Sequence, residues 1–187
     1  MPDLYATLIM ENPEMRRTVF AMACMAMLTS ASSALAQAPD PNFYYKLSTQ
    51  FLGENMPMDV FDGGRRNNQA RLNNDQNVSG QHWQFEPMRN GSYRLRTEFA
   101  GPGMCLDINS STNRPELRDC GDLTGQFWQI RQSGEWMVLT TTFGGRNMCL
   151  DIDPDSNQPE LRRCGDYSGQ FWRLQSTGER VSWPPTR

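Results

Sequence analysis

Apolar and polar side chains alternate along short stretches of this chain, and the same alternation returns three times. A Leu-x-Thr-x-Phe pattern occupies residues 47–51, 95–99 and 139–143. A second alternation starts at Trp83, Trp128 and Trp172, each followed two residues later by another apolar side chain. A period of two predicts β-strands whose Leu, Thr, Phe and Trp side chains face a core. The residues after each Trp are expected to face outward, and they are Gln84, Gln129 and Arg173.

Further positions recur in step with this alternation. Each Trp ends a Gly-Gln-x-Trp motif, the motifs lie about 44 residues apart, and their glutamines are Gln81, Gln126 and Gln170. An Asp at the end of a strand-like run also recurs, as Asp59, Asp107 and Asp151. An Asn recurs between each of these Asp residues and the next strand, as Asn68, Asn113 and Asn157. Turn formation is its expected role. The chain therefore contains an internal threefold repeat.

Each repeat supplies about four short strands separated by Gly, Asn, Asp and Pro turns. Twelve short strands in three equal units predict a closed all-β body with threefold pseudosymmetry, because closure removes exposed sheet edges. The Trp side chains are predicted to lie in the core, and the motif glutamines are expected to be structural. His82 takes the place of Phe127 and Phe171 on the opposite strand face, so it is expected to be a surface or rim residue without a catalytic role.

Three Gly-Gln-x-Trp motifs in register, each preceded by a Leu-Asp or Met-Asp strand, resemble the ricin B-type lectin family. The resemblance covers about residues 43–176 and implies a β-trefoil, in which six strands form a barrel and three hairpins cap it. It also implies a module that binds glycans without catalysis and without a cofactor. In the family, the Asp at the recurring position accepts hydrogen bonds from two sugar hydroxyls. A local turn-capping role explains the same Asp nearly as well.

The resemblance marks eight candidate ligand-binding residues: Asp59, Asn73, Asp107, Glu116, Arg118, Asp151, Glu160 and Arg162. The chain departs from the family in three ways. Asn73, Arg118 and Arg162 stand where galactose-binding copies carry an aromatic platform. Gly80, Gly125 and Gly169 stand where those copies carry Asn, and Glu116 and Glu160 stand where the family often has Gln. Simple galactose binding is therefore not implied.

Two arginines suggest what replaces the missing platforms. By the family's geometry, Arg118 and Arg162 are each expected to lie across a shallow pocket from the Asp of their repeat. A guanidinium group is always charged and suits a carboxylate or phosphate, so an acidic glycan is one hypothesis. The alternative is a surface salt bridge with a neighbouring Asp or Glu, worth about 0–1 kcal/mol and functionally silent.

The N-terminal region has the pattern of a secretory signal peptide over residues 1–36. Two arginines precede a short apolar run, and Ala34-Leu35-Ala36 forms an Ala-x-Ala cleavage site. Residues 1–14 lack these features, so Met15 is an alternative start. The expected order is then a linker at 37–42, the repeat domain at 43–176 and a tail at 177–187. Export to the periplasm or the outside is predicted.

Four cysteines follow this segment and allow three pairings. The first repeat lacks both cysteine positions together, having Pro57 and Asp75 there. Cysteines that vanish as a pair within a repeat are expected to bond within a repeat. The predicted disulfides are Cys105–Cys120 and Cys149–Cys164, and an exported protein retains such bonds.

Charge and composition exclude some classes of function. The formal net charge is -3, whereas a nucleic-acid-binding domain is usually strongly basic. No run of 18 apolar residues indicates a membrane span. Residues 151–155 resemble the start of a calcium loop but lack its Gly and final Glu, so no metal site is predicted.

Two alternatives to glycan binding remain open. A protein-interaction module, such as an adaptor subunit of a toxin complex, needs an exposed apolar patch outside the Asp loops, with Tyr44, Trp136 and Trp183 as candidates. A small carbohydrate-active enzyme needs two carboxylates converging in one cleft.

Overall fold

The computed structural model describes residues 38–183. The predicted signal peptide lies outside the described residues. The described part contains twelve strands, β1 (Phe43–Thr49), β2 (Met58–Val60), β3 (Ala70–Leu72), β4 (Trp83–Pro87), β5 (Tyr93–Thr97), β6 (Met104–Ile108), β7 (Pro115–Asp119), β8 (Trp128–Ser133), β9 (Trp136–Thr141), β10 (Met148–Asp153), β11 (Gln158–Arg163) and β12 (Trp172–Arg180). Its 3-10 helices are η2 (Gly64–Arg66), η3 (Ser79–Gln81), η4 (Thr124–Gln126), η5 (Gly145–Asn147) and η6 (Ser168–Gln170).

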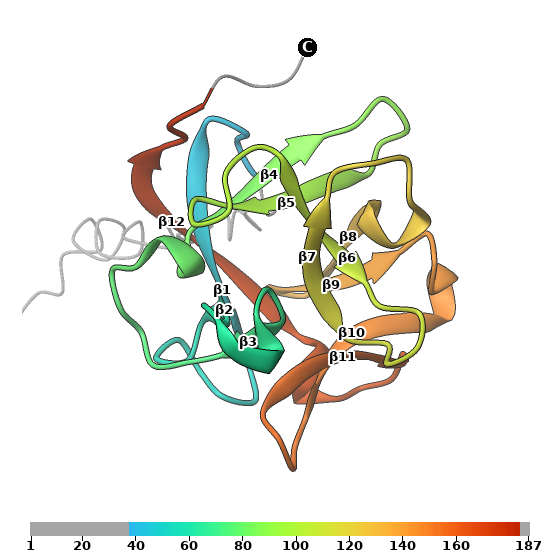
Figure 1. Cartoon of the computed structure of the whole chain (residues 1–187). Helices are drawn as coiled ribbons and strands as arrows, with labels where there is room; N and C mark the ends of the chain where they lie inside the picture. Colours follow the sequence, from blue (N-terminus) through green and yellow to red (C-terminus); the bar gives the residue numbers. More distant parts are fainter. Residues whose placement is uncertain (1–37, 184–187) are drawn as a thin grey trace, which may run out of the picture. The chain divides into compact units, whose positions relative to one another are not determined.

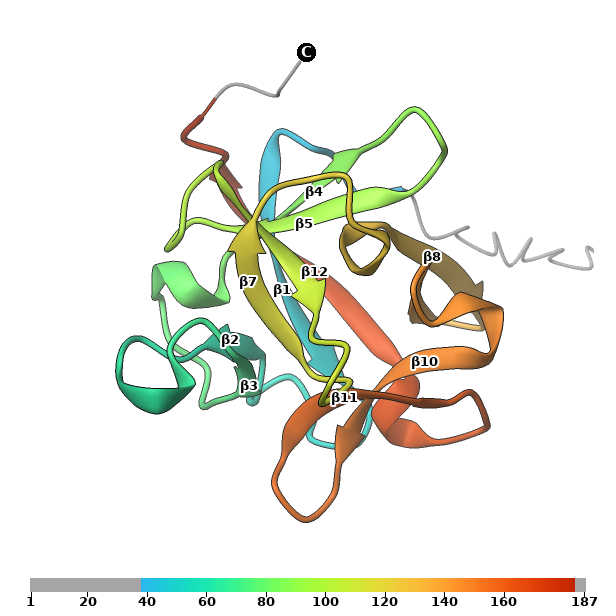
Figure 2. The same ribbon diagram turned by 45° about the vertical axis from the view of Figure 1, so that its right-hand side comes forward.

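Six of the strands close into a barrel. Their antiparallel pairings run β12–β1–β4–β5–β8–β9 and return from β9 to β12, so the ring has no open edge. The other six strands form the hairpins β2–β3, β6–β7 and β10–β11. Strands β3, β7 and β11 contact one another, which brings the three hairpins together (Figures 1 and 2). This is the predicted β-trefoil, and the prediction of twelve strands in three units is confirmed.

Each repeat places its Trp in the core in the same way. Trp83, Trp128 and Trp172 are fully buried. Each indole Nε1 donates a hydrogen bond of 2.8 Å to a backbone oxygen of its own repeat's hairpin strand, and the acceptors are Met58, Leu106 and Leu150. A buried indole needs such a partner, so the Trp joins the barrel to the hairpin as well as filling the core.

The hairpin turns and disulfides also follow the repeat. The three recurring Asn residues have positive φ angles of 68°, 58° and 53° at positions 68, 113 and 157, a region that Asn tolerates better than most residues. Their predicted role in turns is confirmed. Both predicted disulfides are present, Cys105–Cys120 and Cys149–Cys164, each between residues 15 positions apart.

One prediction from the alternating pattern was wrong, namely that the three recurring Phe side chains face the core. Leu and Thr of the Leu-x-Thr-x-Phe pattern are buried, but the strands end at the Thr and the three Phe side chains are 39–45% exposed. Gln84 is fully buried because Pro41 and Trp183 hydrogen-bond to its side chain. Gln129 and Arg173 are half-buried. Segments from outside the repeat therefore cover the first repeat's outer face.

The last strand is longer than its counterparts. Strand β12 continues to Arg180, past the expected end of the repeat domain at 176, and pairs with β1 along its length. No helix within residues 38–183 has the length and apolarity needed to cross a membrane.

Candidate functional site

The motif glutamines connect the end of each hairpin to the barrel. In every repeat the Gln Oε1 accepts a hydrogen bond of 2.9 Å from the backbone N–H five residues before it. Its Nε2 donates to a backbone oxygen seven residues before it, at 2.8–3.0 Å. Gln81, Gln126 and Gln170 are at most 1% exposed. Through these contacts each glutamine holds the chain between the end of its hairpin and the barrel strand.

The three recurring Asp residues are buried rather than displayed. Asp59, Asp107 and Asp151 are 3%, 4% and 6% exposed. In each, Oδ1 accepts a hydrogen bond of 2.7–2.8 Å from the backbone N–H of the next residue. One carboxylate oxygen therefore caps the local backbone, as the turn-capping alternative proposed. Oδ2, which does not take part in this cap, is the oxygen considered for a ligand.

Glycine before the motif Gln makes room for this carboxylate. A Cβ at Gly80, Gly125 or Gly169 would lie 2.1–2.4 Å from the Asp Oδ1 of the same repeat. Real Cβ atoms do not approach so closely, so an Asn there would displace the Asp. The Gly in place of the family's Asn therefore leaves the space into which the Asp carboxylate turns.

The second oxygen, Oδ2, has different partners in the three repeats. In the first, Arg71 and Asn73 both donate to Asp59 Oδ2, the Asn at 3.0 Å. In the second, Asp107 Oδ2 has a single contact of 3.5 Å from the motif Gln. In the third, that contact shortens to 2.9 Å at Asp151. Since a carboxylate oxygen has two lone pairs, the second and third repeats can accept a further hydrogen bond and the first is saturated.

The arginines of the second and third repeats pair with acidic neighbours instead of standing free. Arg118 forms an ion pair with Glu116, and Arg162 forms one with Glu160. Arg162 also lies 3.4 Å from Asp153. The Glu160 contact raises the pKa of Arg162, while hydrogen bonds from the Ser156 side chain and the Asp155 backbone lower the pKa of Asp153. The salt-bridge alternative therefore describes the structure.

Exposed apolar side chains occur in pairs beside the three Asp residues, a feature that the sequence analysis missed. Of the described residues, the exposed large hydrophobic side chains are Phe51, Val78, Phe99, Leu123, Phe143 and Tyr167. One member of each pair lies two residues before the motif Gly, and the other is a recurring Phe from the next repeat's strand end. The backbone N–H of each Phe donates a hydrogen bond of 3.0–3.2 Å to the carbonyl oxygen of the residue after the other member of its pair, from Phe51 to Ser168, Phe99 to Ser79 and Phe143 to Thr124. The recurrence of Phe was the available signal.

One of these pairs belongs to a hollow of useful size. The third-repeat hollow has a volume of about 350 Å³ and is lined by residues including Phe51, Asp151, Arg162, Asp166 and Tyr167. The corresponding first-repeat hollow, beside Asp59, Asn73 and Phe99, is about 230 Å³. Small-molecule sites usually exceed about 300 Å³. The third-repeat hollow therefore combines adequate space, an acceptor oxygen and two exposed aromatic rings, one of which, Phe51, comes from the first repeat.

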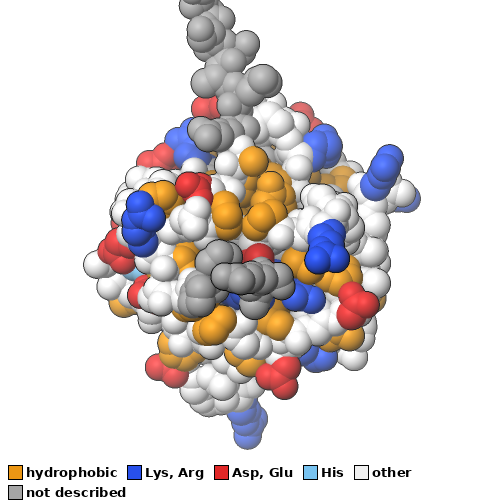
Figure 3. Space-filling model, turned by 90° about the horizontal axis from the view of Figure 1, so that it is seen from above, with side chains coloured by type: hydrophobic (Ala, Val, Ile, Leu, Met, Phe, Trp, Pro, Cys, Tyr) orange, Lys and Arg blue, Asp and Glu red, His pale blue; other side chains and the backbone are white. Residues whose placement is uncertain are grey.

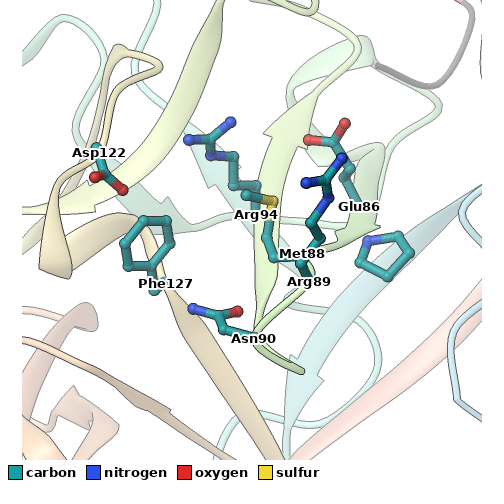
Figure 4. A pocket seen from close by; sticks show the side chains of 8 residues that line it. Glu86, Met88, Arg89, Asn90, Arg94, Asp122 and Phe127 are labelled. Atoms are coloured by element: carbon teal, nitrogen blue, oxygen red, sulfur yellow. The ribbon is translucent and has the colours of Figure 1, made fainter. Parts of the chain in front are cut away.

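Another cavity, of about 410 Å³, lies beside the β4–β5 hairpin (Figure 4). Glu86 and Asp122 both line it, and a pair of carboxyl groups in one cleft is the first requirement for a glycosidase. Glu86, however, is held by Arg96 at 2.7 Å, and Figure 4 shows Arg94 between the two carboxyl groups. A paired carboxylate next to two guanidinium groups is a poor general acid, so the cavity does not support the enzyme alternative.

The aromatic residues proposed for a protein-interaction patch do not form one. Tyr44 is 1% exposed, which contradicts its expected place in a patch. Its ring packs against that of Trp183 at 5.6 Å between centroids. Trp136 is half-buried and lies under the guanidinium of Arg173, 4.5 Å from its ring centroid. On the face seen in Figure 3, basic and acidic side chains are intermixed with hydrophobic ones, so no single-sign charged surface is present there.

A closed trefoil with three Gln-x-Trp repeats defines a class of small all-β binding modules. The sequence matches the Ricin-type beta-trefoil lectin domain over residues 91–186, half of the chain. The chain belongs to this family of lectin domains, which implies a carbohydrate-binding module. Such domains are typically non-catalytic, although some are attached to enzymes. No curated protein matches the sequence.

Solved structures share the fold at low sequence identity. The designed threefold protein ThreeFoil is 18% identical, with a TM-score of 0.62 over 71% of this chain and 97% of that one. The Polyporus squamosus lectin is 14% identical, with a TM-score of 0.63 over 74% of this chain and 50% of its own. An endo-β-galactosidase from Clostridium perfringens is 14% identical, with a TM-score of 0.62 over 72% of this chain and 32% of that one. The chain therefore spans about a third of that enzyme and half of that lectin.

Proposed function

We propose that this chain is an exported, non-catalytic glycan-binding module whose working site is the third-repeat hollow. The observation that carries the proposal is the position of the exposed apolar side chains. Every large one among the described residues flanks an Asp loop, where a lectin needs it. An adaptor would need such a patch elsewhere. The two disulfides are consistent with an extracellular protein.

The hollow favours a sugar ring lying between Phe51 and Tyr167. An aromatic face buries the apolar C–H face of a sugar, and Asp151 Oδ2 has a free lone pair for one hydroxyl. The first repeat offers no equivalent, because Asp59 Oδ2 is occupied by Arg71 and Asn73. The second repeat is intermediate, with Leu123 in place of an aromatic residue.

A neutral glycan fits this site better than an acidic one. Asp151 and Asp166 line the hollow against a single Arg162, so the lining groups carry net negative charge. Arg162 is moreover paired with Glu160. An acidic glycan is the second candidate, since the Arg162 side chain remains 42% exposed and could exchange its partner.

A glycan array probed with residues 37–187 tests the proposal, followed by titration of the strongest hit. Replacing both Phe51 and Tyr167 with Ala should weaken binding at least about tenfold, because about 1.4 kcal/mol of lost contact suffices for that factor. The matched control is Val78→Ala with Phe99→Ala, which truncates the first-repeat pair and should leave the affinity unchanged.

Three outcomes distinguish the candidates. Binding that depends on Phe51 and Tyr167 and is insensitive to salt supports the neutral-glycan site. Binding that falls between roughly 0.05 and 0.5 M salt, and is lost in Arg162→Ala, selects the acidic glycan instead. Equal binding by both double variants, or no binding to any glycan, contradicts the proposed site.

A further inference from the structure

The only histidine of the chain is buried next to two carboxylates from distant segments. His82 is 3% exposed, so the expectation of a surface residue was wrong. Its Nδ1 lies 2.7 Å from Glu98 Oε2 and 3.6 Å from Glu179 Oε2. The three atoms lie within 4.8 Å of one another. The Tyr44 ring stacks on the imidazole at 5.9 Å between centroids, which fixes the plane of the ring.

This cluster breaks the threefold repeat at two positions that face each other. The backbone N–H of Glu98 donates to the carbonyl oxygen of His82 at 2.9 Å. The same bond joins the equivalent pairs of the other repeats, Thr142 to Phe127 and Gln50 to Phe171. The fold at these two positions therefore does not require charged side chains, because the other repeats have Phe with Thr or Gln there. A His and a Glu occupy these positions together only where the first repeat's motif meets the second repeat's strand, and Glu179 of the extended β12 is also present there.

Within residues 38–183, the ion pairs of this cluster join only its own three members. Among the described residues, the ion-pair partner of Glu98 and of Glu179 is His82 alone. Two carboxylates thus converge on one imidazole in a partly buried place, where like charges repel more strongly than in water. A dication would cancel the charge of the two carboxylates.

We propose that Nδ1 of His82, Glu98 and Glu179 form a site for a zinc-type divalent cation. Zinc prefers tetrahedral nitrogen and oxygen ligands at about 2.0–2.2 Å, so neighbouring ligand atoms lie roughly 3.3 Å apart. The separations of 2.7 and 3.6 Å bracket that value. Glu98 is 33% and Glu179 49% exposed, which leaves the cation an entry path and a fourth position for water.

The ring presents a single nitrogen to the cation. Nε2 of His82 is buried and has no hydrogen-bond partner among the described residues, so Nδ1 is the atom directed at the carboxylates. A neutral ring that donates its Nδ1 proton to Glu98 must therefore move that proton to Nε2 when the metal binds. Imidazole favours Zn²⁺, Cu²⁺ or Ni²⁺ over Ca²⁺ and Mg²⁺.

Such a site would fasten the end of the trefoil to its beginning. Glu179 lies in β12, the last strand of the barrel, whereas His82 lies in the first repeat's motif and Glu98 directly follows β5. The cation would join segments far apart in the sequence. Because it binds the folded arrangement alone, it would raise the unfolding temperature with concentration.

Zinc titration of the purified chain, followed by the imidazole nitrogen resonances, tests the proposal. With one histidine, the spectrum reports this site directly. We expect one Zn²⁺ per chain at micromolar concentration, resonances of a metal-bound Nδ1 and a protonated Nε2, and a higher melting temperature. Glu98→Gln with Glu179→Gln should weaken zinc affinity at least about tenfold. The matched control, Glu135→Gln, alters a 73% exposed carboxylate that pairs with Arg173 elsewhere.

Other outcomes overturn the proposal. Unshifted resonances at about 100 μM Zn²⁺ would mean that the cluster is a hydrogen-bonded group only. Equal zinc affinity in the double variant, or equal binding of Ca²⁺, would mean that zinc is held by surface carboxylates in general. His82→Phe restores the residue of the other repeats, so its melting temperature should no longer respond to zinc.

Discussion

Gly169→Ala tests whether the recurring Asp residues are structural caps. The new Cβ would lie 2.3 Å from Asp151 Oδ1, so the carboxylate must move and release the backbone N–H of Ile152, which it holds at 2.7 Å. Leaving a buried N–H unpaired costs about 1–3 kcal/mol. We therefore expect the free energy of unfolding to fall by about that amount. Urea-induced unfolding with the disulfides intact measures it through the fluorescence of the buried Trp residues.

Gly103→Ala is the matched control. A Cβ at Gly103 meets no atom within 4 Å and its φ is not positive, so this change should alter stability by less than about 0.5 kcal/mol. A double-mutant cycle sharpens the result. In an Asp151→Ala background the contact with Oδ1 is removed and only the contact of 3.1 Å with the Ile152 backbone nitrogen remains, so Gly169→Ala should cost clearly less than in the unmodified chain. Equal costs for the two glycines, or an unchanged cost in that background, would refute the reasoning.

Two further predictions concern the third repeat. Replacing Cys149 and Cys164 with Ser should lower the free energy of unfolding by about 3 kcal/mol in the chain-entropy view, because the bond closes a loop of 15 positions; an unchanged urea midpoint would contradict this. The pKa of Asp153 is lower in the folded state than its unfolded value of about 3.9. Ionised Asp153 therefore stabilises the fold at a pH above about 3.9, and this contribution is lost as the pH falls through the pKa of the folded state. Asp153→Asn should therefore lower the melting temperature at pH 7 but not at pH 2, and an equal effect at both would exclude this role.

The repeat made most of the fold predictable. Alternation around each Gln-x-Trp motif placed the three Trp side chains in the core, and recurrence of Asn placed the turns. The paired absence of cysteines from the first repeat selected the disulfides. These features are local, because spacing within one repeat determines which side chains face inward. Because each motif occurs three times, a substitution in one repeat does not hide the pattern.

The candidate sites depended on contacts between repeats. Phe51 continues a core-facing alternation but lies beyond the end of its strand, and the hollow that it enters belongs to Asp151 in another repeat. The repeat pattern also did not predict which side chain hydrogen-bonds to each Asp. Asn73 donates to Asp59, whereas Arg162, at the equivalent position of the third repeat, pairs with Glu160.

The sequence by itself determined a threefold all-β body with buried Trp residues, Asn turns and two disulfides inside repeats. Only the tertiary structure decided which side chains gather across the boundaries between repeats. His82 and Glu179 show the reason most directly. Closure of the barrel brings β12 beside the first repeat, so two residues remote in sequence lie 3.6 Å apart. The periodic pattern of the sequence shows which side chains of a strand face the core. It does not show which residues of distant strands become neighbours, because that depends on the last strand closing the barrel.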